Sequence, residues 1–308
     1  MKTVFTITSL LFLIISCRNS VEKKDSTESG EHVSYNSWSI SSVNDWATNA
    51  GLLNIESIAY DKGQEVFYAS NGLNYKPGTD GFISKLSKDG SLLELKWITG
   101  LNRPTGMAIR DSILYVADVN SLVLINTKNG RIVKRLMEPV ANSGLNDVAI
   151  NKKGEVYVSA SFVHSILKLD REKLEVWLKD EEKLTWANGL IAEDTKLIVA
   201  GLHLSSVDTS SKQTSRIELN PIIKDFDGIT PDGLGGYFLT TVENSGLFYF
   251  DEQKNVYNLM QNDTYFGDIE FNPYNKRLYC PRGKKATGDF FITEFSMKEQ
   301  FQTKNKHQ

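Results

Sequence analysis

The chain has 308 residues and a formal net charge of −3 at pH 7, with 40% hydrophobic and 24% charged residues. Because the positive and negative charges are nearly balanced, the sequence lacks the basic field that binds nucleic acid, and it predicts no nucleic-acid partner. The only two cysteines are Cys17 and Cys280, which excludes a network of intramolecular disulfides. Cys280 lies on a predicted strand, where we expect a buried, inert thiol.

The first residues have the features of a secretory signal. A basic start is followed by an apolar run over residues 4–15, and the run ends at Ser16-Cys17. This run is too short to span a bilayer, which takes about 20 residues, so we predict a signal peptide over residues 1–16.

The four residues 14–17, Ile-Ile-Ser-Cys, resemble a bacterial lipobox. A lipobox implies a lipoprotein signal peptide, lipidation of Cys17 and an anchor in the bacterial cell envelope, on the periplasmic or the outer-membrane face. An ordinary signal peptide with an incidental cysteine is the alternative. Residues 17–34, rich in Ser, Lys and Glu, predict a polar tether, and residues 301–308 predict a polar C-terminal tail.

Six short motifs recur over residues 35–300, and each begins with a residue that leads an apolar stretch. The intervals between the leading residues are 49, 41, 42, 39 and 40. A repeat of about 40–50 residues made of short strands is typical of β-propeller blades. The leading residues are Glu56, Thr105, Asn146, Asn188, Asp227 and Gly267.

Further strand-like runs follow each motif. The second runs are rich in β-branched and aromatic residues, as strands are, and cover residues 65–70, 113–117, 155–159, 196–200, 236–240 and 277–280. Third runs cover residues 82–86, 122–125, 166–169, 247–250 and 290–292, and the fourth repeat is unclear over 203–211. The charged stretch 171–183 fits a hairpin better than a helix.

These runs predict an all-β, six-bladed β-propeller over residues 35–300, folded as a single domain. A strand near residues 37–40 is expected to join the last blade and close the ring. Closure of this kind would cover edge strands that otherwise pair with other chains.

Equivalent positions of the blades converge on one central channel, so four of the leading side chains are expected to meet there. Glu56, Asn146, Asn188 and Asp227 supply carboxylate and amide oxygens only. Such a set suits Ca²⁺, with another divalent cation possible, and argues against zinc. A bound ion polarises a carbonyl or phosphoryl oxygen, and Asp227 can accept a proton or act as a nucleophile. Alternatively, these side chains only line a water-filled channel.

The motifs also carry a resemblance to a known family. Glu in blade one, Asn in blades three and four and Asp-Gly in blade five resemble the SMP-30/gluconolactonase/LRE-like family, over nearly all of the chain after the tether. The resemblance implies a calcium-dependent hydrolase that opens a lactone or related ester of a small molecule. It further implies that Glu56, Asn188 and Asp227 bind the metal, that Asn146 contacts substrate or metal, and that Asp227 is the base or nucleophile.

Three positions depart from this family. Its lactonases often carry an arginine two residues before the blade-three asparagine, where this chain has Gly144. The first motif reads Glu-Ser-Ile at residues 56–58 in place of Glu-Gly-Pro. Phosphotriesterase-like members place a histidine in the last blade, where Gly267 and Asp268 stand here. The sequence therefore favours the metal site over any particular substrate.

A second function remains open. Residues 103–107, Arg-Pro-Thr-Gly-Met, resemble NHL repeats, which implies a non-catalytic propeller that binds a protein or glycan partner through rim loops such as residues 73–80. Trp186, two residues before Asn188, is expected to pack in the core rather than to wall a pocket.

Overall fold

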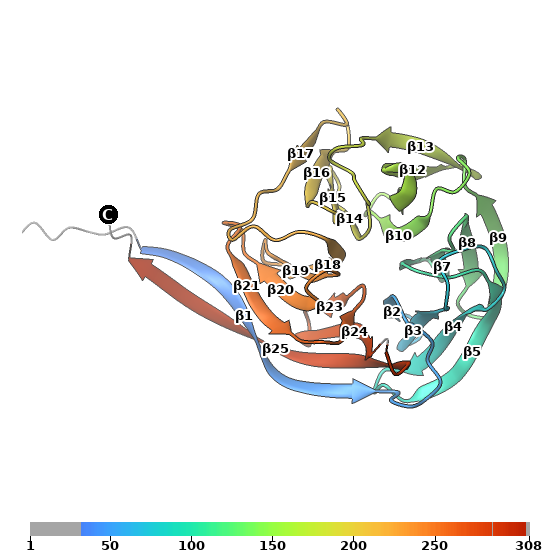
Figure 1. Cartoon of the computed structure of the whole chain (residues 1–308), viewed down its shortest axis with the longest axis horizontal. Helices are drawn as coiled ribbons and strands as arrows, with labels where there is room; N and C mark the ends of the chain where they lie inside the picture. Colours follow the sequence, from blue (N-terminus) through green and yellow to red (C-terminus); the bar gives the residue numbers. More distant parts are fainter. Residues whose placement is uncertain (1–31, 285, 306–308) are drawn as a thin grey trace, which may run out of the picture. The chain divides into compact units, whose positions relative to one another are not determined.

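The computed structural model describes residues 32–284 and 286–305, so the predicted signal peptide and Cys17 lie outside the described residues. Residues 34–303 form a body of six β-sheets arranged in a ring (Figure 1). The one helical element of the described part is a single 3₁₀ turn, η1 (Ser161–Val163). No helix among the described residues is long and apolar enough to cross a membrane. The predicted all-β, six-bladed propeller is confirmed.

The first three blades are four-stranded antiparallel sheets formed by consecutive segments. In each of them the first strand lies toward the centre of the ring and the fourth lies at its periphery (Figure 1). Blade one contains β2 (Ile58–Asp61), β3 (Val66–Asn71), β4 (Gly81–Ser87) and β5 (Leu92–Leu101); blade two contains β6 (Met107–Arg110), β7 (Ile113–Ala117), β8 (Ser121–Asn126) and β9 (Arg131–Met137); blade three contains β10 (Leu145–Ile150), β11 (Val156–Ala160), β12 (Ser165–Asp170) and β13 (Lys173–Lys179).

Blades four and five repeat this pattern, and blade six has a fifth strand. Blade four contains β14 (Leu190–Ala192), β15 (Lys196–Val199), β16 (Ser205–Asp208) and β17 (Thr214–Arg216); blade five contains β18 (Phe226–Pro231), β19 (Tyr237–Thr241), β20 (Gly246–Phe250) and β21 (Val256–Gln261); blade six contains β22 (Tyr265–Phe266), β23 (Glu270–Asn272), β24 (Arg277–Lys284), β25 (Asp289–Asn305) and β1 (His32–Trp46).

Burial differs systematically across a blade. Every residue of β3, β11 and β19 is buried, because neighbouring blades cover both faces of these second strands. They therefore appear in the sequence as continuous apolar or aromatic runs rather than as alternating ones. The fourth strands β5, β9, β13 and β21 are largely exposed, which explains their weak sequence signal. The expected hairpin over 171–183 is confirmed by β13, and Cys280 is buried on β24, as predicted.

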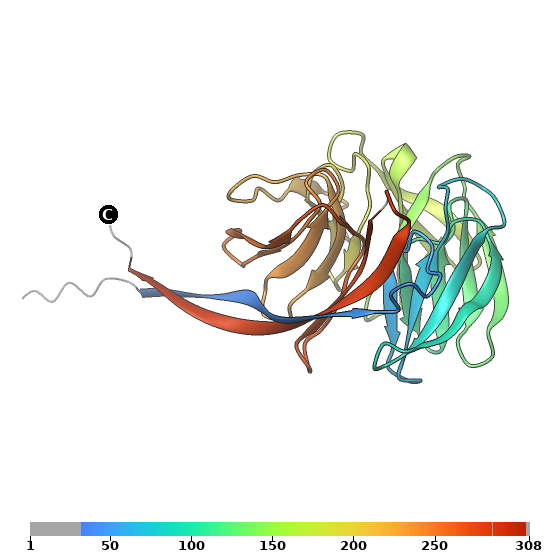
Figure 2. The ribbon, with the colours of Figure 1, turned by 60° about the horizontal axis from the view of Figure 1, so that its bottom comes forward.

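The ring is closed by β1, which pairs with β25 at the outer edge of blade six (Figure 2). Ser41 Oγ donates to the carbonyl of Ser296 at 2.9 Å. Trp38 is 4% exposed and belongs to the core cluster of blades five and six. Its ring lies 5.6 Å from that of Phe238, and its Nε1 donates to Asp232 Oδ2 at 3.2 Å. The predicted closure near residues 37–40 is thus confirmed.

The closing strands extend beyond the limits of 35 and 300 that the sequence predicts for the domain. β1 begins at His32 and β25 ends at Asn305, so strand structure also covers residues 301–305 of the predicted tail. The physical reason is that two paired strands satisfy each other's backbone groups without needing apolar side chains. Polar pairs fit this outer edge, such as Gln300 Nε2 donating to Ser39 Oγ at 3.0 Å.

Glycines in the second motif position allow adjacent inner strands to approach each other closely. A Cβ atom on Gly228 would lie 2.5 Å from Asp268 Cα in blade six, and one on Gly189 would lie 2.4 Å from the carbonyl oxygen of Asp227 in blade five. Both distances are far below van der Waals contact, so only glycine fits. The Asn-Gly and Asp-Gly pairs of the sequence therefore reflect packing between blades as much as turn formation.

Candidate functional site

The leading residues stand where the inner strands begin, and the backbone brings those starts together. Gly189 N donates to the carbonyl of Asp227 at 3.0 Å, and Asp268 N donates to the carbonyl of Glu56 at 2.7 Å. Blade four is thus joined to blade five, and blade six to blade one. Blade two is joined to blade three in the same way, because the carbonyl of Asn146 accepts from Gly106 N at 2.7 Å.

Asp227 is buried and held by two side chains. Asn188 Nδ2 donates to its Oδ1 at 2.8 Å, and the hydroxyl of Tyr265 donates to its Oδ2 at 3.2 Å. Burial raises the pKa of Tyr265 well above its usual value, and the charge of Asp227 raises it further. The phenol therefore keeps its proton and remains a donor. The prediction that Asn188 and Asp227 converge is confirmed by this contact.

Tyr265 was not predicted from the sequence, although the sequence contains a signal for it. The sixth motif begins with Gly267, which has no side chain to point into the channel. A Cβ atom there would lie 3.0 Å from the Tyr265 hydroxyl and 2.4 Å from the carbonyl oxygen of Glu56. The glycine therefore leaves the space in which Tyr265 reaches Asp227.

Glu56 and Asn146 line one cavity of about 180 Å³, together with Thr105, Tyr75 and Arg103. Glu56 Oε2 and Asn146 Oδ1 are both buried, and neither accepts a hydrogen bond. A buried oxygen without a partner costs about 1–3 kcal/mol, so two of them in one cavity call for water or a bound group there that supplies donors or positive charge.

Glu56 lies in buried and largely acidic surroundings. Burial raises its pKa well above the usual value, and the charges of Asp227 and Asp268 raise it further. The guanidinium of Arg103 opposes this effect. A divalent cation would reverse the balance by stabilising the ionised carboxylates.

The donor set fits a hard cation. Within residues 32–284 and 286–305, no three His, Cys, Asp or Glu side chains gather as a ligand cluster. A metal here would consequently depend on two carboxylates, Glu56 and Asp227, completed by the amide oxygens of Asn146 and Asn188. Such an oxygen-only shell of low charge suits Ca²⁺, whose remaining positions are filled by water or substrate.

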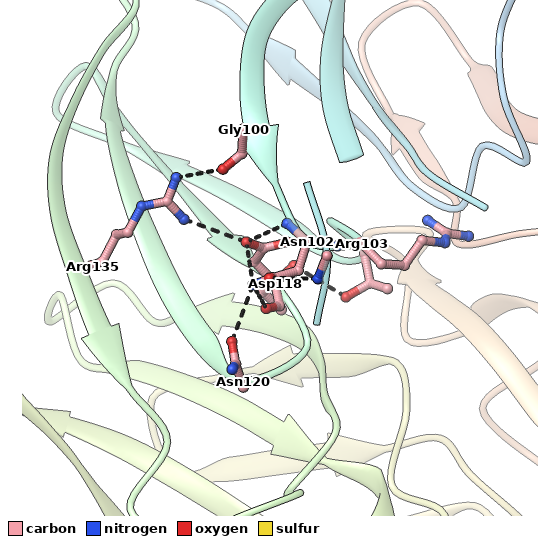
Figure 3. Close-up of polar contacts among 9 residues, drawn as sticks. Gly100, Asn102, Arg103, Asp118, Asn120 and Arg135 are labelled. Carbon is pink, nitrogen blue, oxygen red and sulfur yellow. Dashed lines mark hydrogen bonds and ion pairs between the residues drawn. The ribbon is translucent and has the colours of Figure 1, made fainter. Parts of the chain in front are cut away.

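Arg103 is a second residue that the sequence did not single out for the site. Asp118 accepts from the backbone N of Arg103 at 2.9 Å and from that of Asn102 at 3.0 Å, and it pairs with Arg135 at 3.5 Å (Figure 3). Asp118 is fully buried and holds the segment that carries Arg103, as expected for a turn-stabilising carboxylate.

The Arg103 side chain extends away from Asp118 (Figure 3). Its two terminal nitrogens donate to the carbonyls of Pro104 and Asn54, each at 2.8 Å. A Cβ atom on Gly72 would lie 2.6 Å from Arg103 Cδ, so the glycine makes room for this path. The result is a fixed, buried positive charge beside Glu56.

The loop over residues 73–80 contributes to the rim, as expected. Leu73 and Tyr75 line the cavity of Glu56, and the Tyr75 hydroxyl donates to the carbonyl of Leu145 at 2.7 Å. Trp186 differs from its expectation: it is 51% exposed and packs in no core cluster. Trp186 lies in the loop before β14 and has φ 53°, in the left-handed region that side chains rarely adopt.

A second channel cavity, of about 320 Å³, is lined by the inner strands and by three acidic side chains, Asp147, Asp268 and Glu270. Two of them join adjacent blades. Asp147 Oδ2 accepts from Leu190 N at 2.6 Å, and Asp268 Oδ2 accepts from Ser57 Oγ at 3.0 Å. Burial raises the pKa of Asp268 to about 7 and that of Glu270 to about 8, with nearby acidic groups adding to both effects.

The raised pKa of Glu270 predicts a pH-dependent stability. An unfolded glutamate ionises near pH 4.3, whereas the folded chain keeps this proton up to about pH 8. The free energy of unfolding should therefore fall as pH rises between those values. Glu270→Gln removes this contribution, so the variant should gain stability relative to the wild type from pH 5 to pH 9 in urea titrations. Glu94→Gln, at an exposed site on β5, is the control; parallel curves for Glu270→Gln and the wild type would contradict the raised pKa.

Comparison with solved structures gives three informative likenesses. Virginiamycin B lyase from Staphylococcus aureus, as a catalytically inactive variant with quinupristin, has a TM-score of 0.59 at 11% identity, over 84% of this chain and 99% of that chain. Luciferin-regenerating enzyme gives 0.61 at 14% identity, over 83% and 95%. A gluconolactonase from Xanthomonas campestris gives 0.57 at 14% identity, over 79% and 86%.

These likenesses establish the fold. The chain shares the propeller architecture of the luciferin-regenerating enzyme and the gluconolactonase, so the expected similarity to their family is confirmed at the level of fold. No protein-family model matches the sequence, and no curated protein matches it.

Proposed function

We propose that the chain is a divalent-cation-dependent hydrolase, with calcium as the preferred ion, that opens a lactone or related ester. The observation that carries this proposal is the pair of buried oxygens, Glu56 Oε2 and Asn146 Oδ1, which accept no hydrogen bond from the described residues and share one cavity, while the charge of Asp227 acts on Glu56. The fold shared with a gluconolactonase supports the reaction class.

Glu56, Asn188 and Asp227 would hold the cation, and Asn146 would contact the cation or the substrate. The bound ion would polarise the carbonyl oxygen of the ester. With the ion bound, Glu56 and Asp227 would be ionised and would balance its charge.

Asp227 performs the proton transfer. One of its oxygens takes a proton from water, and the water oxygen adds to the carbonyl carbon. The bond between this carbon and the ring oxygen then breaks, and the proton passes to the leaving alkoxide, which gives a hydroxy acid. Tyr265 and Asn188 fix the orientation of Asp227 through their hydrogen bonds, and Arg103 supplies positive charge beside the forming carboxylate.

Cation binding is the direct test. In calorimetric titrations with Ca²⁺, Mg²⁺ and Mn²⁺, the wild type should bind one ion per chain, and Glu56→Gln should bind none measurably, because half of the carboxylate charge is lost. Glu94→Gln should bind like the wild type. If the wild type bound no cation and its melting temperature did not respond to any, the hydrolase proposal would fail and a partner-binding propeller would remain.

The mass of the product distinguishes hydrolysis of the substrate from elimination. Hydrolysis of a cyclic ester adds the mass of one water, whereas elimination leaves the mass unchanged. The likeness to a lyase makes this comparison necessary, and mass spectrometry of the product decides it. The lipid anchor on Cys17 and the location in the cell envelope stay predictions from the sequence.

A further inference from the structure

Four aromatic side chains form a connected row that begins at the cavity of Glu56. The Tyr75 ring lies 5.3 Å from the Phe162 ring at 83°, and the Phe162 ring lies 5.8 Å from the Trp186 ring at 87°. The Trp186 ring lies 5.8 Å from the His164 ring at 88°. Each contact is edge to face, the arrangement that aromatic rings favour.

The row begins inside the site. Tyr75 lines the cavity that contains Glu56 and Asn146. Phe162 packs over Gly144, two residues before Asn146, where a Cβ atom would lie 2.7 Å from the Phe162 ring. Trp186 stands two residues before Asn188. The rings are therefore carried by the segments that also position two of the proposed cation or substrate contacts.

Phe162 and Trp186 are 46% and 51% exposed although they are large and apolar. The backbone is strained at Trp186 and at His164, because each has φ 53°, a region that side chains rarely occupy. The backbone N of Trp186 donates to His164 Nδ1 at 3.2 Å, which fixes the two residues relative to each other. Ligand sites combine apolar and aromatic side chains with a few polar groups, and strained backbone clusters at such sites.

We propose that Phe162 and Trp186 form an apolar wall that binds a hydrophobic, preferably aromatic, substituent of the substrate. The inference rests on the proposed function and names its substrate class: a lactone or ester that carries an aryl group, not a polyhydroxylated sugar lactone. Tyr75 connects this wall to the cavity, so the ester group lies at Asp227 while the aryl group covers the Trp186 ring.

The experiment compares γ-butyrolactone, γ-phenyl-γ-butyrolactone and gluconolactone as substrates of the purified protein with Ca²⁺ supplied. The wild type should show a kcat/KM for the phenyl lactone about tenfold or more above that for γ-butyrolactone, since burial of the phenyl ring adds binding energy. Gluconolactone should be the poorest substrate. Trp186→Ala should remove this preference, mainly through KM, and leave γ-butyrolactone within about twofold of the wild type.

Two further variants test whether the preference for the phenyl lactone depends on an apolar ring at position 186. Trp186→Phe should retain part of the preference, because an apolar ring remains. Tyr274→Ala removes a residue that is 89% exposed and should change nothing. Hydrolysis without a preference for the phenyl lactone, or equal losses on both γ-lactones in Trp186→Ala, would overturn the wall and leave the proposed function standing.

A binding assay covers the case in which no lactone is hydrolysed and the proposed function fails. Calorimetric titration with 5-phenyl-2-pyrrolidinone, a lactam that resists hydrolysis, then tests the wall alone. Saturable binding by the wild type that Trp186→Ala loses would support the wall as a ligand site. Absence of binding, or equal binding by both proteins, would overturn it.

Discussion

Asp227→Asn is expected to abolish measurable Ca²⁺ binding, as Glu56→Gln does, and to lower kcat by at least about a hundredfold to ten-thousandfold, the usual contribution of a general base. The side chain keeps its shape, but it can no longer take a proton, and half of the carboxylate charge of the site is lost. The measurements are lactone hydrolysis, Ca²⁺ titration and a thermal melt by circular dichroism. The melt should stay close to that of the wild type, because Tyr265 and Asn188 can still hydrogen-bond to an amide at this position.

The matched control is Asp170→Asn, which makes the same chemical change at an exposed position at the end of β12. It should be indistinguishable from the wild type in all three measurements. Full activity of Asp227→Asn with a normal Ca²⁺ affinity would show that Asp227 is neither base nor nucleophile.

Trp38→Ala should produce the largest loss of stability, about 3–5 kcal/mol in the free energy of unfolding. The indole is 4% exposed, packs on Phe238 and Phe271, and donates to Asp232. Truncation would leave a cavity between β1 and blade five and would deprive a buried carboxylate of a donor. Urea unfolding monitored by circular dichroism gives the value.

Trp38→Phe should cost less than Trp38→Ala, because it keeps one ring in the core and loses the hydrogen bond, worth about 1 kcal/mol, together with the volume of the second ring. Trp186→Ala is the control for removal of a tryptophan, and it should cost little because that side chain is half exposed. A small effect of Trp38→Ala, comparable to that of Trp186→Ala, would show that β1 does not hold the ring closed.

The fold could be predicted from the sequence because its signal repeats. Second strands such as β11, buried on both faces, recur as apolar runs at nearly constant spacing, and six copies outweigh an unclear fourth repeat. The ends of the closing strands were less predictable from the sequence. β25 continues to Asn305 through polar residues, because its pairing with β1 requires only backbone groups.

The sequence predicts the site residues that occupy repeated motif positions, and it does not predict those that lie beside the motifs. Asn188 and Asp227 occupy equivalent motif positions, and they are in contact. Tyr265 and Arg103 reach the channel from positions that flank the motif, through space left by Gly267 and Gly72. Such paths depend on the packing between blades, which the spacing of motifs does not reveal.

Ring closure has a consequence for the kinetics of refolding. The proposed site takes Glu56 from blade one and Asp227 from blade five, and blade six between them is completed by β1, whose Ser41 contacts Ser296, 255 positions further along the chain. Contacts between such distant segments form slowly, because closing so long a loop costs conformational entropy before the contact stabilises the chain. Recovery of activity after dilution from urea should accordingly lag behind the recovery of β-structure, and the length of that lag would time the last step in the assembly of the ring.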